Sequence, residues 1–261
     1  MATAETIAIT IDKLEMAYGD FVIQRDLNFR IHVGEIFIIM GDSGSGKSTL
    51  LRHLIGLQRP SKGEIRYGET SFWGMPEDER RRFSQRFGVL YQSGALWSSM
   101  TLAQNIMLPL KEHADYSTKE VAELASFKLS LVGLAGFEDY YPAEISGGMR
   151  KRAALARAMA LDPEILFFDE PSAGLDPISS RRLDDLILEL RDSLGSTIVV
   201  VTHELASIFT IADNAVFVDA EARTQTALGN PKELRDHPPS EKVGEFLRRG
   251  VSVESKKEAG P

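Results

Sequence analysis

The amino-acid sequence predicts an α/β fold built around a parallel sheet. Three short apolar runs are too short for helices and end in polar or glycine residues, which is typical of buried parallel strands. They span residues 36–40, 165–168 and 197–201. Helical patterns lie between and after these runs, and the clearest covers residues 177–194, with Asp176 placed to cap its start and Gly195 to end it. Strands that alternate with helices indicate this fold class.

The helical patterns are concentrated in the middle of the chain. Between about residues 95 and 160 they follow one another with no convincing strand, which predicts a helical insertion. After Gly229 the chain becomes polar and contains prolines, and its last residues, SVESKKEAGP, have the composition of a disordered end. We therefore expect four segments: a β region with the first part of the core (1–94), a helical subdomain (95–160), the rest of the core (161–229) and a tail (230–261).

Composition excludes several classes of protein. Thirty basic and 38 acidic residues give a net charge of -8, which argues against a nucleic-acid binder that depends on a basic surface. No cysteine is present, so disulfides and cysteine-bound metals are excluded. The N-terminus does not have the pattern of a secretory signal. The longest uncharged stretch, residues 87–110, is interrupted by polar residues and Pro109, so membrane association is expected to come through a partner.

Residues 41–48, GDSGSGKS, fit the phosphate-loop pattern G-x-x-x-x-G-K-[ST] between a predicted strand and a predicted helix. Glycines let the backbone N–H groups turn towards phosphate oxygens, and the helix N-terminus adds its positive end. In this pattern Lys47 reaches the β- and γ-phosphates and the Ser48 hydroxyl binds Mg²⁺. The alternative is a plain glycine-rich turn. The expected nucleotide contacts are Gly41, Ser43, Gly44, Ser45, Gly46, Lys47, Ser48 and Thr49.

A second motif, ILFFDE at residues 165–170, places two carboxylates at the end of an apolar strand. Asp169 is positioned to hold Mg²⁺, usually through water, and Glu170 to polarise an attacking water. Alone, such a pair is more commonly a solvated acidic turn. Together with the phosphate loop it predicts a site that hydrolyses a nucleotide.

Residues 145–152, ISGGMRKR, place a serine and two glycines before a helix, where free N–H groups form an anion site or are met by a plain helix cap. This motif, shortly before the acidic strand, resembles the signature motif of ABC ATPases. The resemblance covers about residues 7–247, and its motifs occur in the expected order. Ile145 stands where leucine usually opens the signature, a change that keeps the apolar character.

The resemblance to ABC ATPases implies a phosphate-loop NTPase fold with a RecA-like parallel-sheet core, an N-terminal antiparallel β region and an inserted helical subdomain. It also implies roles for residues that are ordinary on their own. Tyr18 matches the aromatic residue that stacks on adenine. Gln92 matches the loop glutamine that contacts the metal or water. His203 matches the switch histidine that contacts the γ-phosphate.

In the family, each ATP lies between the phosphate loop of one subunit and the signature motif of another. The resemblance therefore implies that Ser146, Gly147 and Gly148 act on the ATP of a second subunit, either an identical copy or a related ATPase. Residues 172–176 match the loop through which the two subunits communicate. Glu170, His203, Lys47 and Gln92 are the expected catalytic residues, with ATP and Mg²⁺ as ligands.

Several segments, including QSGALWSSMTLAQNIMLPL and EPSAGLDPISS, are similar to the ATPases of MCE-type lipid transport systems such as the Mla pathway. The similarity implies phospholipid transport between the inner and outer membranes, with the ATPase at the cytoplasmic face of the bacterial inner membrane. The implied partners are a permease dimer, which would contact residues 89–101, and a periplasmic MCE-type lipid-binding protein. A small cytoplasmic regulatory subunit is a further candidate.

Two alternatives remain open at this point. One is the ATPase of an amino-acid or drug transporter, whose core motifs are the same. The other is an ABC ATPase of DNA repair or translation, which is disfavoured because the chain has neither long heptad arms nor a second cassette. A scaffold without catalysis is disfavoured because every hydrolytic residue is present. Asp42 inside the phosphate loop would repel ATP if it faced inward, so we expect it to face solvent or a basic neighbour.

Overall fold

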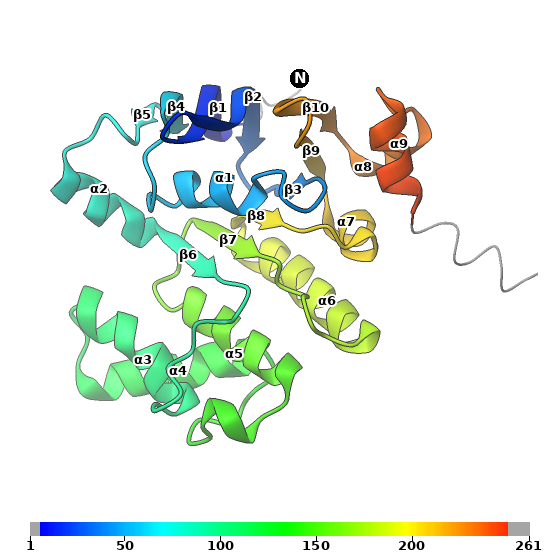
Figure 1. The fold of residues 1–261 in the computed structure, drawn as a ribbon. Helices are drawn as coiled ribbons and strands as arrows, with labels where there is room; N and C mark the ends of the chain where they lie inside the picture. Colours follow the sequence, from blue (N-terminus) through cyan, green and yellow to red (C-terminus); the bar gives the residue numbers. More distant parts are fainter. Residues whose placement is uncertain (1–5, 250–261) are drawn as a thin grey trace, which may run out of the picture. The chain divides into compact units, whose positions relative to one another are not determined.

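The computed structural model describes residues 6–249 (Figure 1). The end predicted to be disordered, residues 252–261, lies outside the described residues. Two compact units make up the described part of the chain. The sheet unit comprises residues 6–80 and 197–249, and the helical unit comprises residues 81–196. These boundaries differ from those of the four predicted segments, which remain a prediction.

An antiparallel sheet forms the N-terminal part of the sheet unit. Strands β1 (Ile7–Tyr18) and β2 (Phe21–His32) form a long hairpin, β4 (Lys62–Tyr67) pairs with β1, and β5 (Thr70–Ser71) pairs with β4. Alternate residues of each strand face inward, and apart from Gln24 the buried side chains of β1 and β2 are apolar. They include Ile9, Ile11, Leu14, Leu27, Phe29 and Ile31. The predicted N-terminal antiparallel β region is confirmed.

The parallel strands of the sheet unit are buried, except at Asn214, the first residue of one of them. Strand β3 (Ile36–Met40) lies between β8 (Thr197–Val201) and β9 (Asn214–Asp219), both parallel to it, and β10 (Thr224–Gly229) runs antiparallel to β9. Two of the predicted parallel strands are therefore confirmed. Helix α1 (Lys47–Leu54) follows β3, and α7 (Leu205–Ile211) follows β8. Because β3 and β8 are parallel, the loops after them meet at the same edge.

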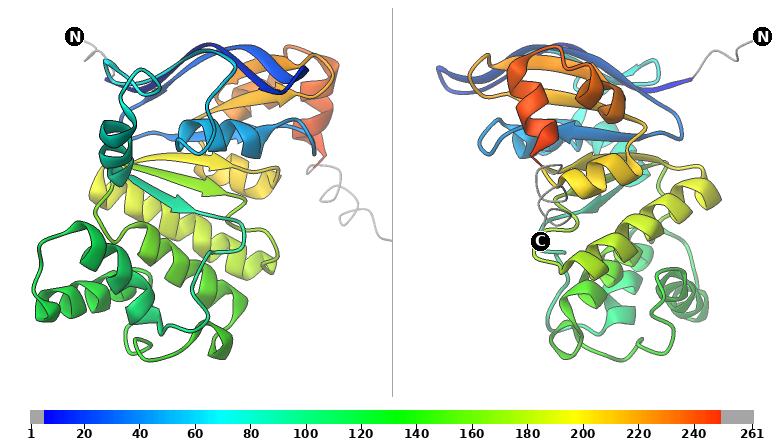
Figure 2. Two further views of the ribbon diagram at one scale, coloured as in Figure 1. Left: turned by 60° about the vertical axis from the view of Figure 1, so that its left-hand side comes forward. Right: turned by 90° about the vertical axis from the view of Figure 1, so that its right-hand side faces the viewer.

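The polar, proline-containing segment after Gly229, to which no helix was assigned from the sequence, contains two, α8 (Pro231–Asp236) and α9 (Glu241–Arg248). Ser240 caps α9 by accepting a hydrogen bond from the Val243 N–H, and Val243, Phe246 and Leu247 form its buried face. Both views of Figure 2 show α8 and α9 beside β9 and β10. Phe246 packs edge-on against Phe217 of β9, with ring centroids 5.1 Å apart.

The helical unit contains a parallel strand pair, β6 (Phe87–Leu90) and β7 (Ile165–Asp169), and four longer helices. The helices are α3 (Leu102–His113), α4 (Thr118–Leu131), α5 (Gly147–Ala158) and α6 (Pro177–Leu194). Short α2 (Glu77–Phe83) leads into this unit. The predicted strand at residues 165–168 and the predicted bounds of α6 are confirmed, with Asp176 as N-cap and Gly195 in the left-handed conformation. Among residues 6–249, no helix has the length and apolar character needed to cross a membrane.

Candidate active site

The phosphate loop joins β3 to α1, and two of its glycines have no room for a side chain. A Cβ on Gly41 would lie 2.3 Å from the Val218 carbonyl oxygen, and one on Gly46 would lie 2.7 Å from Ile23. Gly46 also has a left-handed φ of 91°. The loop is therefore pressed against β9 and the β1–β2 hairpin, which fixes its curvature.

Lys47 folds back over this loop. Its Nζ atom donates hydrogen bonds to the carbonyl oxygens of Gly41 at 2.8 Å and Asp42 at 2.9 Å. Helix α1 begins at Lys47, and its N-cap, Gly46, supplies no side-chain cap. The first-turn N–H groups and a lysine ammonium group thus meet at one helix end, which is an arrangement suited to a phosphate group.

Gln24, on β2, hydrogen-bonds to the backbone of the phosphate loop, and none of the sequence motifs indicates this role. It is fully buried, and its Nε2 atom donates to the carbonyl oxygens of Ser45 and Asp219, each at 2.8 Å. A buried glutamine in an otherwise apolar strand pattern is the signal that could have identified it, because a buried amide requires polar partners.

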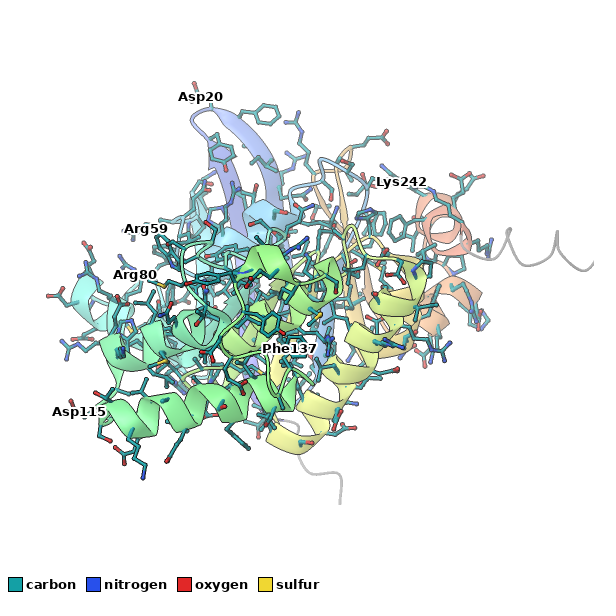
Figure 3. All side chains as sticks on the ribbon, turned by 90° about the horizontal axis from the view of Figure 1, so that it is seen from below. Asp20, Arg59, Arg80, Asp115, Phe137 and Lys242 are labelled. Atoms are coloured by element: carbon teal, nitrogen blue, oxygen red, sulfur yellow. The ribbon has the colours of Figure 1, made fainter. Side chains whose placement is uncertain are left out.

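Tyr18 and His203, two predicted contacts of the nucleotide, belong to the same unit as the phosphate loop. Tyr18 is half exposed at the end of β1, next to the hairpin tip where Figure 3 labels Asp20, and its hydroxyl donates to Gln58 Oε1 at 3.1 Å. His203 is exposed and follows β8, and the N–H of the preceding Thr202 donates to the Ile39 carbonyl at 3.3 Å. The ends of β3 and β8 are therefore joined directly.

Asp42 faces a basic residue, as expected. Arg249, just after α9, donates from Nη1 to Asp42 Oδ1 at 3.1 Å. The prediction that this carboxylate would point to solvent or to a basic neighbour is confirmed.

The two acidic residues of the helical unit lie at the end of β7. Asp169 is the last residue of the strand, and Glu170 has a left-handed φ of 47°. A non-glycine residue in this region costs about 1–3 kcal/mol and persists only where its surroundings hold it. The Glu170 carbonyl accepts a hydrogen bond from the Ala173 N–H at 3.1 Å, which tightens the turn after the strand.

Lys151, on α5, connects the predicted catalytic residues of this unit. Its Nζ atom donates to the Gln92 carbonyl at 2.5 Å and to the Glu170 carbonyl at 3.5 Å. Burial lowers the pKa of this lysine, while the nearby charges of Asp169 and Glu170 act to raise it. The loop after β6 and the loop after β7 are thus held by one ammonium group.

Replacing Lys151 with methionine should reduce ATP turnover about tenfold, because Gln92 and Glu170 would lose their common anchor. The measurement is steady-state phosphate release by the full chain. Lys119→Met, at an exposed position of α4, is the matched control. Equal turnover in the two variants would show that Lys151 does not position these residues.

The predicted signature residues lie at the start of α5. Ser146 is the N-cap, and its Oγ atom accepts a hydrogen bond from the Met149 N–H at 3.3 Å. The hydroxyl keeps its own hydrogen for donation. Ser146 and Gly147 are exposed, whereas Gly148 is half-buried, with 3.4 Å between a Cβ built on it and Ser179 Oγ. Ser146 is therefore a helix cap, the alternative left open for this motif, while the role of residues 146–148 towards a nucleotide stays a prediction.

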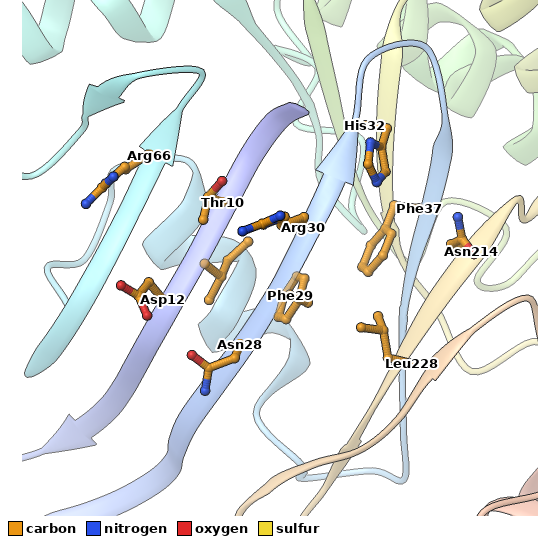
Figure 4. Close-up of a pocket in the computed structure, with 11 residues that line it drawn as sticks. Thr10, Asp12, Asn28, Phe29, Arg30, His32, Phe37, Arg66, Asn214 and Leu228 are labelled. Atoms are coloured by element: carbon orange, nitrogen blue, oxygen red, sulfur yellow. The ribbon is translucent and has the colours of Figure 1, made fainter. Parts of the chain in front are cut away.

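A cavity of about 620 Å³ in the sheet unit is separate from the predicted nucleotide contacts. Figure 4 shows Arg30, Thr10 and Arg66 in a row across β2, β1 and β4, in agreement with their pairing in the sheet. Arg66 donates to Glu64 at 2.6 Å, so part of the positive charge is already neutralised. None of the residues lining this cavity was predicted as a site residue.

The chain matches the family model described as ABC transporter over residues 24–173. The probable ribonucleotide transport ATP-binding protein mkl of Mycobacterium tuberculosis is 42% identical over 208 residues, which cover 80% of this chain and 58% of that protein. The chain thus spans less than two thirds of this relative. The intermembrane phospholipid transport system ATP-binding protein MlaF of Escherichia coli is 37% identical over 245 residues, which cover 93% of this chain and 90% of MlaF.

Among solved structures, the dimeric ATP-binding cassette MJ0796 in a post-hydrolysis state, bound to ADP and phosphate, is similar with a TM-score of 0.77 and 27% identity. The similarity covers 85% of this chain and 98% of that one. The predicted fold class, including its parallel core and helical insertion, agrees with this likeness.

Proposed function

Because this chain belongs to the ABC transporter family of ATP-binding proteins, we propose that it hydrolyses ATP to power phospholipid transport between the inner and outer membranes. The observation that carries the proposal is the similarity to MlaF, which extends over 93% of this chain and 90% of that protein. The chain would act as the engine of the transporter, and the lipid itself would be handled by its partners.

In this proposal the phosphate loop binds the triphosphate, Lys47 donates to its terminal oxygens, and Tyr18 stacks on adenine. The Ser48 hydroxyl, the Gln92 amide and the Asp169 carboxylate supply oxygen donors, the ligands that Mg²⁺ prefers. When bound, Mg²⁺ supplies charge neutralisation at the phosphates. The fold that places these groups at strand ends and a helix start supports their assignment.

Glu170 is the proposed general base. It would accept a hydrogen bond from the attacking water, orient it and take up its proton as the water oxygen bonds to the γ-phosphorus and the bond from that phosphorus to the bridging oxygen of ADP breaks, which releases ADP and phosphate. His203 would contact the γ-phosphate, and Lys47 would stabilise the charge that develops there. The anchoring of Glu170 and Gln92 by Lys151 supports this arrangement, because a general base must be held within hydrogen-bond reach of its proton.

Two copies of the chain are proposed to form the working enzyme. Ser146, Gly147 and Gly148 of one copy would complete the ATP site of the other, and the exposure of Ser146 and Gly147 supports this role. ATP would close the dimer, and hydrolysis would release it. We retain the predicted division into core (1–94 and 161–229), helical subdomain (95–160) and tail (230–261) as part of the proposal.

The permease is proposed to dock near the start of α3. Trp97 is 54% exposed there, and a cavity of about 300 Å³ is lined by Met100, Gln104, Met107, Leu108 and Lys111. Asn105 is fully buried and holds the preceding loop, since its Oδ1 accepts from the Trp97 N–H at 2.7 Å and its Nδ2 donates to the Trp97 carbonyl at 3.1 Å. Exposed aromatic and apolar groups on a fixed loop suit a protein interface. Leu90, by contrast, belongs to the core.

The proposed complex contains a homodimer of this chain, a permease dimer and a periplasmic MCE-type lipid-binding protein, with a small cytoplasmic regulatory subunit as a further candidate. It contains no nucleic acid. The chain would be held at the cytoplasmic face of the bacterial inner membrane through the permease.

Extraction of a tagged chain from its own membranes in mild detergent tests this function. The expected result is a retained permease, an MCE-type protein and phospholipid, together with ATPase activity. A retained amino acid, drug or ribonucleotide with a different set of partners would contradict phospholipid transport. Retention of ribosomes or nucleic acid without a permease would contradict transport altogether.

A further inference from the structure

We propose that Arg249 is a positioning residue that neutralises Asp42 and thereby raises the affinity of the phosphate loop for ATP. The inference rests on the proposed function of this loop and adds a contribution from the C-terminal helix. Arg249 and Asp42 are 207 positions apart in sequence, yet their side chains form an ion pair of 3.1 Å. The ion pair therefore depends on the folded position of α9.

The backbone of Asp42 is part of the phosphate-binding machinery. Its carbonyl accepts hydrogen bonds from Lys47 Nζ at 2.9 Å and from the Ser45 N–H at 3.2 Å. Its carboxylate thus places a negative charge on the loop that is proposed to hold a triphosphate. The negative charges of the carboxylate and of the phosphates repel each other. Arg249 offsets that charge and holds the carboxylate towards α9.

Contacts with β9 hold helix α9 in the position that brings Arg249 to Asp42. Near its start, Lys242, labelled in Figure 3, donates to Asp219 Oδ1 at 2.7 Å. Towards its end, Phe246 is buried against Phe217, and the Arg249 guanidinium lies 5.7 Å from the centroid of the Phe246 ring. Strand β9, which carries Phe217 and Asp219, pairs with β3, the strand that leads into the phosphate loop.

A second chain of hydrogen bonds joins the same elements. Asp219 binds Lys242 through its carboxylate and Gln24 through its carbonyl, and Gln24 in turn donates to the Ser45 carbonyl of the phosphate loop. The residue that anchors α9 therefore also holds the glutamine that braces the loop. Arg249 directly follows α9. This helix is connected to the phosphate loop through the pairing of β9 with β3 and through the hydrogen bonds of Asp219, Gln24 and Ser45.

The ion pair is partly exposed, with side-chain exposures of 60% for Arg249 and 30% for Asp42, so its effect is expected to be moderate. Arg249→Ala should weaken binding of a non-hydrolysable Mg-ATP analogue about three- to tenfold, and the loss should shrink at high salt. In an Asp42→Asn background the same replacement should have no further effect. Arg248→Ala removes the same charge one residue earlier, from a side chain that donates to the Arg235 carbonyl at 3.4 Å, and is the control. The measurement is titration calorimetry on the full chain.

Each outcome decides the inference. Equal affinities of the wild type and Arg249→Ala would overturn it, and so would an equal loss from Arg249→Ala in the presence and absence of the Asp42 carboxylate. A tenfold or greater gain in affinity from Asp42→Ala with Arg249 in place would show that the carboxylate faces the phosphates and would also overturn it. If the wild type failed to bind the analogue at all, the proposed function would fail too.

Discussion

Glu170→Gln is expected to slow ATP hydrolysis by about 10²- to 10³-fold while ATP binding is retained. Glutamine has the shape of glutamate, so the left-handed turn at φ 47° and the hydrogen bonds of the residue 170 carbonyl should survive. The amide, however, cannot take up the proton of an attacking water. Single-turnover phosphate release at saturating Mg-ATP measures this effect on the chemical step.

Glu164→Gln is the matched control for this experiment. Glu164 directly precedes β7, so it lies at the opposite end of the same strand, and its exposed carboxylate pairs with Arg86. This variant should turn over ATP at the rate of the wild type. Normal turnover by Glu170→Gln would remove Glu170 from the role of general base and leave the water without an assigned partner.

Lys47→Ala is expected to weaken ATP binding by about 100-fold or more. Lys47 is almost buried, and its Nζ atom lies over the loop through its bonds to the Gly41 and Asp42 carbonyls, so its loss should remove the proposed charge-assisted hydrogen bonds to phosphate. The measurement is calorimetric titration with a non-hydrolysable Mg-ATP analogue, accompanied by circular dichroism to establish that the variant is folded.

Lys62→Ala removes an exposed lysine of the same unit, where it pairs with Glu15, and should bind the analogue like the wild type. A folded Lys47→Ala variant with the affinity of this control would show that the loop does not hold phosphate through Lys47. The assignment of residues 41–48 as a phosphate loop would then lose its main support.

Much of the fold could be predicted because its decisive elements have local signals. The β3 run is apolar throughout and the β8 run is apolar after Thr197, which is typical of strands buried on both faces. Helix α6 carries its own start and stop signals in Asp176 and Gly195. The phosphate loop could be located because its glycine spacing is a recognisable pattern. Gly41 and Gly46 of that pattern stand where a side chain would clash with β9 or with the β1–β2 hairpin.

The contacts that connect these elements could not be predicted, because they join residues distant in sequence. Lys151 is one of three consecutive basic residues, and only the packing of α5 decides that it is the one that reaches Gln92 and Glu170. Its spacing of four from the buried Leu155 is a weak signal that it lies on the inner face. Helix α9 was missed because prolines and charges dominate its surroundings, although Val243, Phe246 and Leu247 have helical spacing.

The central claim is that ATP joins two copies of this chain by binding between the phosphate loop of one and the Ser146 helix end of the other. Sedimentation equilibrium of the Glu170→Gln variant measures this directly, with and without Mg-ATP. The mass is predicted to double when Mg-ATP is added, and to stay that of a monomer when Gly148→Asp is introduced as well. A variant that binds Mg-ATP yet keeps the mass of a single chain would contradict the account.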